Sequence, residues 1–149
     1  MSRRRCPTRP PLAVDLTRPR GYPVELPVPP SANHLWRSVR SGRGGKVRVI
    51  ATENYRRWLD VAVPLLRLTA PAVRGRVAVL VTVVGGKGFK LSRDIDNCNK
   101  AVVDSLRHAG VIDGDSVEVL RRVVAEYRDG DGGPARCEVT VTPWAGGGG

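Results

Sequence analysis

The chain has 149 residues, 41% of them hydrophobic, which fits one domain with one core. No apolar run approaches the roughly 20 residues of a membrane helix, and no apolar stretch follows the arginines at residues 3–5. We therefore expect neither a membrane protein nor a secretory signal, and we expect a cytoplasmic location. The net charge is +11, and residues 1–20 hold six arginines and one aspartate, which leaves +6 for the rest. A body that is basic without its N-terminal segment favours an anionic partner such as nucleic acid.

Three cysteines are present, Cys6, Cys98 and Cys137, and no two of them form a CxxC pair. This spacing suggests neither a zinc ribbon nor a disulfide framework. We expect three reduced thiols in a cytosolic protein. The two histidines, His34 and His108, are interpreted as structural or surface residues.

The residue pattern predicts a series of strands with two helices between them. Thr52 followed by Glu53 is a typical helix start, and large apolar side chains then recur at helical spacing as far as Leu66. A second helix is predicted from Asp96 to about His108, where Gly110 is a natural stop. The remaining predicted elements are a strand at Tyr22–Val28, a turn at Ser31–Asn33, a flexible hairpin tip at Ser41–Gly45, and strands at Lys46–Ile50, Arg74–Val84, Val117–Tyr127 and Cys137–Thr142.

The order of these elements is β-β-α-β-α-β-β. It predicts an α+β fold, with one mixed sheet and two helices packed on it. Four prolines among the arginines of residues 1–20 predict a disordered basic arm. The predicted organisation is therefore this arm, a folded domain over residues 21–144, and a flexible glycine tail over residues 145–149.

Candidate catalytic residues lie in one short acidic segment. Asp94 and Asp96 are two residues apart, so in an extended segment both carboxylates point the same way. If Asp96 opens the helix, Lys100 lies one turn further on the same side. Asp115 follows the helix and can approach the other acids only if the intervening loop turns back. Three carboxylates and an ammonium group suit a Mg²⁺ site that activates water and relieves charge on a phosphodiester.

Simpler interpretations of the same residues stay open. Asp96 can be only a helix N-cap, which local pattern alone slightly favours. Lys100 can be half of a surface pair with Asp96 or Asp104. Asp115, with its neighbour Asp113, can be a turn residue beside glycine. A calcium-binding loop is rejected because Cys98 stands where an Asp or Asn belongs.

The acidic segment resembles the motif of the RusA family of Holliday junction resolvases. The run from Arg93 to Asn97, followed by Lys100, is similar to the family's Arg-Asp-x-Asp-Asn motif and its following lysine. The run Leu106–Ile112 with Asp115 resembles its helix end and third acid, and Pro29–Asn33 resembles its Pro-Pro-Ser-x-Asn turn. The likeness runs from about Val24 to Thr142. It departs from the family at Gly114, where some members carry another acid, and the two tails have no counterpart.

The resemblance implies a dimeric, Mg²⁺-dependent endonuclease that nicks four-way DNA junctions symmetrically, with Mn²⁺ as an alternative ion and no small-molecule cofactor. It implies that Asp94, Asp96 and Asp115 bind metal, and that Lys100 is catalytic with them. Supporting residues for DNA binding, from motif or charge, are Arg93, Asn97, Lys87, Lys90, Arg43 and Lys46. Tyr55, Trp58 and the valine-rich strand can supply a dimer interface, but ordinary core is the preferred interpretation.

Two other functions fit the sequence. A non-catalytic module that binds DNA or RNA would show the same charge, with salt-sensitive binding and no need for Mg²⁺. A metal-dependent nuclease for flaps or RNA would share the acids, because loops and dimer geometry set the preferred substrate shape.

Overall fold

The computed structural model describes residues 23–145, so the predicted arm and residues 146–149 of the predicted tail lie outside the described residues. None of the helices in this range is long and apolar enough to cross a membrane. The elements are β1 (Val24–Leu26), the 3-10 helix η1 (Ala32–His34), β2 (Trp36–Arg40), β3 (Val47–Ala51), α1 (Glu53–Thr69), β4 (Val77–Val84), the 3-10 helix η2 (Ile95–Cys98), α2 (Asn99–His108), β5 (Leu120–Arg128) and β6 (Arg136–Pro143).

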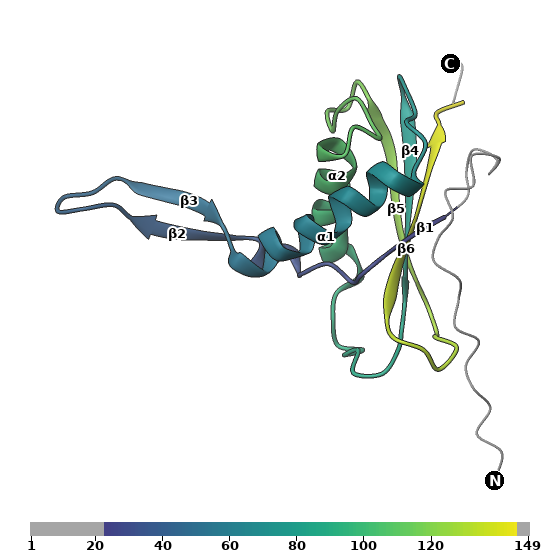
Figure 1. Ribbon diagram of the computed structural model, residues 1–149, viewed down its shortest axis with the longest axis horizontal. Coiled ribbons are helices and arrows are strands. Elements are labelled where there is room, and N and C mark those ends of the chain that lie inside the picture. Colours follow the sequence, from purple (N-terminus) through teal and green to yellow (C-terminus); the bar gives the residue numbers. More distant parts are fainter. Residues whose placement is uncertain (1–22, 146–149) are drawn as a thin grey trace, which may run out of the picture.

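Four strands form one mixed sheet in the order β1-β6-β4-β5. Strand β4 lies parallel to β5 and antiparallel to β6, and β6 pairs antiparallel with β1. Both α-helices pack on the same face of this sheet (Figure 1). The expected α+β architecture is confirmed. The parallel pair requires a crossover connection, and η2 and α2 lie in it.

The core lies between the sheet and the two helices. Alternate residues of β4, Val77, Val79 and Val81, point toward the helices and are at most 1% exposed. Tyr55 and Trp58 of α1 are buried in the same cluster. The preferred interpretation as ordinary core is therefore confirmed for Tyr55, Trp58 and the helix-facing valines of β4. Cys98 and Cys137 are buried and free, as expected, and Cys6 lies outside the described residues.

Several predicted boundaries differ from the structure. The second helix was expected from Asp96, but a 3-10 turn occupies Ile95–Cys98 and α2 begins at Asn99. Strand β5 begins at Leu120 rather than Val117, because the N–H groups of Val119 and Leu120 both donate to the Ser116 carbonyl in a turn. Helix α1 starts as predicted, and the Thr52 hydroxyl accepts a hydrogen bond from the backbone N–H of Tyr55.

Strands β2 and β3 form a separate two-stranded ribbon that projects from the body of the protein (Figure 1). The sequence pattern predicted β3 and the glycine-rich tip but no strand at Trp36–Arg40, so β2 is an addition to the predicted order. Gly42 and Gly44 in the tip have φ values of 72° and 70°. Glycine adopts this left-handed conformation without the Cβ clash of other residues, which explains its use at the tip.

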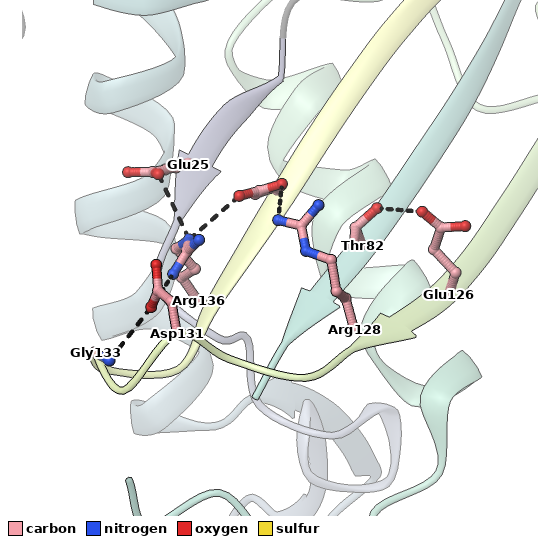
Figure 2. A network of polar contacts seen from close by, with 8 residues as sticks. Glu25, Thr82, Glu126, Arg128, Asp131, Gly133 and Arg136 are labelled. Carbon is pink, nitrogen blue, oxygen red and sulfur yellow. Dashed lines mark hydrogen bonds and ion pairs between the residues drawn. The ribbon is translucent and has the colours of Figure 1, made fainter. Parts of the chain in front are cut away.

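The face of the sheet opposite the helices carries polar and charged side chains (Figure 2). Arg136 forms ion pairs with Glu138 at 3.2 Å and with Glu25 at 3.5 Å, and Arg128 pairs with Glu138 at 2.9 Å. Beside them, the Thr82 hydroxyl lies 2.9 Å from a carboxylate oxygen of Glu126. The described residues place no helix on this face, which we call the open sheet face.

Candidate active site

The acidic segment begins where the loop after β4 enters η2. Asp94 is still extended, with φ −70° and ψ 132°, and the chain then turns into the 3-10 helix that contains Asp96. The extended geometry expected for both acids therefore ends at Asp94. The Asn97 amide donates to Oδ2 of Asp94 at 3.4 Å, and the carboxylate of Asp96 makes no hydrogen bond or ion pair with any described residue. Both carboxylates are exposed, so each is accessible to a cation or a phosphate-bound ion.

Arg93 connects this segment to the N-terminal part of the domain. Its guanidinium donates a hydrogen bond to the Pro29 carbonyl oxygen, and the side chain is half-buried. Cys98 is packed nearby, and burial raises the pKa of its thiol while the Arg93 charge opposes that rise. The contact with Pro29 indicates that Arg93 holds the loop in place, and its role in DNA contact stays a prediction.

Lys100 lies in the first turn of α2 between two carboxylates. Its ammonium nitrogen is 2.9 Å from Oδ1 of Asp104 and 3.8 Å from Oδ2 of Asp115. Asp104 is only 3% exposed, and its other oxygen accepts a hydrogen bond of 2.7 Å from the Tyr55 hydroxyl. Burial and this carboxylate hold the pKa of Tyr55 well above its usual range, so the hydroxyl stays protonated and remains a donor. Lys100 is therefore held in place by Asp104, which is itself held by Tyr55 of the core.

The loop between α2 and β5 turns back along the helix. Gly110, with φ 74°, ends α2, and the return of the loop brings Asp115 within ion-pair distance of Lys100. The sequence did not determine whether this loop turns back, and the structure shows that it does. Asp113 anchors the loop, because its carboxylate accepts hydrogen bonds from the Gly75 N–H at 2.8 Å and from Arg74 at 2.7 Å.

A groove of about 830 Å³ lies beside the acidic segment. Asp94 and Asn97 line one side of it, and the exposed side chains of Lys87 and Lys90 belong to the loop that lines another. The segment that leads into the β2–β3 ribbon, including His34, completes the lining. In such a groove the unpaired lysines can bind the phosphates of a phosphodiester backbone, and the carboxylate can bind a cation that also contacts a phosphate.

The family model for endodeoxyribonuclease RusA matches residues 27–142. The chain belongs to the RusA family. The match covers most of the chain, including the acidic segment, Lys100 and Asp115, and no curated protein matches at a significant level. Membership implies a DNA endonuclease of the Holliday junction resolvase type, and the nucleases of this family are metal-dependent in general.

The metal site expected of a RusA nuclease can be compared with the residues present. Asp94, Asp96 and Asp115 offer exposed carboxylate oxygens, which are the ligands that Mg²⁺ prefers. Within residues 23–145, however, no three His, Cys, Asp or Glu side chains are gathered closely enough to hold one ion. Asp115 instead lies beside Lys100. The donor chemistry fits, and the meeting of the three acids around one cation stays a prediction.

Sequence reasoning missed the central role of Asp104 in this RusA-family site. Asp104 appeared only as one of two possible surface partners for Lys100, yet its carboxylate is buried and also accepts from Tyr55. The i,i+4 spacing of Lys100 and Asp104 was the available signal. Nothing in the sequence indicated the second contact, because Tyr55 lies on another helix.

Replacing Asp113 with asparagine should flatten the acid dependence of stability. Hydrogen bonds from the Gly75 N–H and then from Arg74 lower the pKa of Asp113. A carboxylate with a lowered folded-state pKa stabilises the fold above its unfolded pKa of about 4, and this contribution is lost as the pH falls through the lowered value. Urea unfolding at a series of pH values between about 2 and 6 measures this effect. The free energy of unfolding should change less steeply with pH for Asp113→Asn than for the parent protein.

Asp60→Asn is the matched control for this measurement, because Asp60 is exposed on α1 and its carboxylate makes no hydrogen bond or ion pair with a described residue. It should keep the slope of the parent protein. Equal slopes for Asp113→Asn and the parent protein would contradict the anchoring role of Asp113.

Proposed function

We propose that this protein is a Mg²⁺-dependent endonuclease that resolves four-way DNA junctions by paired, symmetric nicks. The observation that carries the proposal is the placement of Lys100, an ammonium group fixed by the buried Asp104 and 3.8 Å from Asp115, in a chain of the RusA family. Asp94, Asp96 and Asp115 would hold the metal. A bound Mg²⁺ would lower the pKa of a water molecule and neutralise charge on the scissile phosphate.

The protein residues contribute positioning and charge. Lys100 can donate a hydrogen bond to a phosphate oxygen as negative charge develops there, and its attachment to Asp104 reduces the reorganisation that this requires. Lys87 and Lys90 can bind backbone phosphates on either side of the cut, since both are exposed and line the groove beside Asp94. Asn97 would orient Asp94 through its amide hydrogen bond.

The test is a cleavage panel with the full chain. Four-way junction, flap and linear duplex of matched sequence are incubated with Mg²⁺ or with EDTA, each strand being labelled in turn. We expect Mg²⁺-dependent nicks at symmetric positions in two opposite strands of the junction, with 5′-phosphate and 3′-hydroxyl ends that a ligase can reseal. Faster cleavage of the flap would show that the protein is a nuclease with a different preferred substrate. Binding without cleavage of any substrate would show that it is a non-catalytic DNA-binding module.

The proposal includes a homodimer, because two matched nicks in a nearly two-fold symmetric junction need two equivalent active sites. Tyr55 and Trp58 are buried within the subunit, so they are not available for the interface. The open sheet face is the surface we assign to it. This face holds three arginines and three glutamates in a chain of net charge +11, so it is locally neutral and unsuited to DNA.

One pair of charges on the open sheet face, Arg122 and Glu126, is arranged so that a two-fold axis would bring opposite charges together. Leu80, Val124 and Thr140 lie side by side across three strands. Arg122 lies two residues from Val124 on one side of this apolar row, and Glu126 lies two residues from it on the other. A two-fold axis that runs along this row, in the plane of the face, would place Arg122 of each subunit opposite the partner's Glu126. A shallow hollow of about 400 Å³ lined by these residues gives the opposing side chains space.

Leu80→Arg should convert the dimer to a monomer. The substitution buries an unpaired charge at the centre of the interface, and we expect the dimer dissociation constant to rise by about 100-fold or more. Sedimentation equilibrium measures this change, and the junction assay should then show single, uncoupled nicks. Leu68→Arg is the matched control, since Leu68 is 63% exposed on α1. A dimer that survives Leu80→Arg unchanged would remove the open sheet face as the interface.

A further inference from the structure

The β2–β3 ribbon is the most strongly basic part of the described chain. Residues 36–51 contain Arg37, Arg40, Arg43, Lys46 and Arg48 and no acidic residue. None of these five side chains makes a hydrogen bond or ion pair with another described residue. Four arginines on the body differ from these, since Arg57, Arg74, Arg128 and Arg136 form ion pairs. The charge of the ribbon is therefore not needed to hold the fold together.

The ribbon is also unusually exposed for a pair of strands. Within residues 23–145 it pairs with no other strand, and an isolated two-stranded ribbon is marginally stable on its own. One of its faces carries Arg40 together with Trp36, Val47 and Val49, which are 47%, 58% and 65% exposed. The other face carries Arg37 and Arg48 around Val39. Both faces thus combine cationic and apolar groups and are free to contact a partner.

The base of the ribbon is fixed to the body. Leu35 is fully buried, and its carbonyl oxygen accepts from the N–H of Thr52 at 2.9 Å. The Thr52 hydroxyl donates to the His34 carbonyl at 2.7 Å, and Trp36 packs edge-to-face on Tyr55 with ring centroids 5.7 Å apart. His34 also lines the groove that contains Asp94. A ligand that lies in the groove therefore also lies beside the base of the β2–β3 ribbon. The contacts at this base fix the direction in which the ribbon projects.

We infer that the ribbon enters the major groove of a DNA duplex arm next to the cleavage site. Strands of five residues extend about 17 Å, roughly half a turn of B-DNA, and the major groove, about 12 Å wide, admits a two-stranded ribbon. The five cations reach phosphates on both sides of the groove, and Val47 and Val49 can contact thymine methyl groups. The inference rests on the proposed function in taking an arm of the DNA substrate as ligand.

The first test measures DNA binding in EDTA, so that it does not depend on cleavage. Arg40, Arg43 and Arg48 are each replaced by glutamine, and binding of a labelled junction is followed by anisotropy at several salt concentrations. We expect the slope of log K against log salt to fall by about 2 to 3, and the affinity at low salt to fall by tens of fold. The matched control replaces Arg67, Arg76 and Arg121, none of which lines the groove, by glutamine, and it should keep most of the slope.

The second test identifies the groove. In a shortened variant an Asn-Gly turn replaces residues 40–47, which leaves the base of the ribbon and its contact with Tyr55 intact. Dimethyl sulfate methylates guanine N7 in the major groove and adenine N3 in the minor groove. The parent protein should protect guanine N7 in one duplex arm, and the shortened variant should not.

Each other outcome overturns the inference in a definite way. Protection of adenine N3 in place of guanine N7 would place the ribbon in the minor groove. Unchanged DNA binding together with a loss of the dimer on sedimentation would make the ribbon a contact between protein copies. Because neither measurement needs catalysis, a failure here leaves the cleavage assay of the proposed function to succeed or fail by itself.

Discussion

Asp96→Asn should lower the rate of junction nicking by about 1,000-fold or more while the protein folds and binds DNA as before. Asparagine is nearly the same size as aspartate, but it lacks the charge that a divalent cation needs from its ligands. Asp96 is exposed and its carboxylate makes no hydrogen bond or ion pair with a described residue, so its charge has no structural role to lose. Single-turnover cleavage of a labelled junction at saturating protein measures the rate.

The control for this prediction is Asp60→Asn, which removes one negative charge from an exposed position on α1. It should leave the nicking rate within a factor of about two, since surface substitutions away from special contacts have small effects. DNA binding in EDTA should match the parent protein for both variants. A nicking rate of Asp96→Asn equal to that of Asp60→Asn would end the assignment of the acidic segment as the catalytic site.

Lys100→Met should reduce both catalysis and stability, and a second substitution should restore only the stability. Loss of the ammonium group removes a donor to the developing phosphate charge, for which we expect a rate decrease of about 100- to 1,000-fold. It also leaves the carboxylate of Asp104, 3% exposed, without its cation. Because Lys100 is itself about half exposed, we expect a destabilisation of about 1–3 kcal/mol rather than that of a fully buried pair.

The double variant Lys100→Met with Asp104→Asn separates the two effects. The neutral amide can still pair with the Tyr55 hydroxyl, and no charge is left buried, so urea unfolding should return most of the way to that of the parent protein. The nicking rate should stay low. If activity returned together with stability, Lys100 would be a structural residue and not a catalytic one.

The parts of the fold that local pattern could predict are those with local causes. The start of α1 follows from the Thr52 cap, and the valine alternation of β4 follows from burial of one face. Strand β2 was missed because its residues, with arginines at positions 37 and 40, offer little apolar alternation. Its conformation depends on pairing with β3 and on the anchoring of Trp36 against Tyr55, which connects two different elements.

In the candidate site, too, only the features with local causes could be predicted from the sequence. The spacing of Lys100 and Asp104 is a local signal, but the burial of Asp104 depends on Tyr55, 49 residues away in the sequence. The approach of Asp115 to Lys100 depends on a loop that Asp113 ties to Gly75. Neither long-range contact has a sequence signature of its own. The meeting of the three acids remains a prediction, which the nicking rates of Asp96→Asn and its control address.

The crossover between the parallel strands β4 and β5 carries every residue proposed for the chemistry, from Asp94 to Asp115. The ribbon and the open sheet face come almost entirely from other parts of the chain. If the ribbon contacts DNA as inferred, the residues proposed for hydrolysis and this DNA-contacting arm are encoded in separate stretches of the gene. Homologues could exchange or lengthen the ribbon to suit a new DNA shape while inheriting the hydrolytic segment unaltered, and chimaeras that swap only residues 36–51 would carry substrate preference with them.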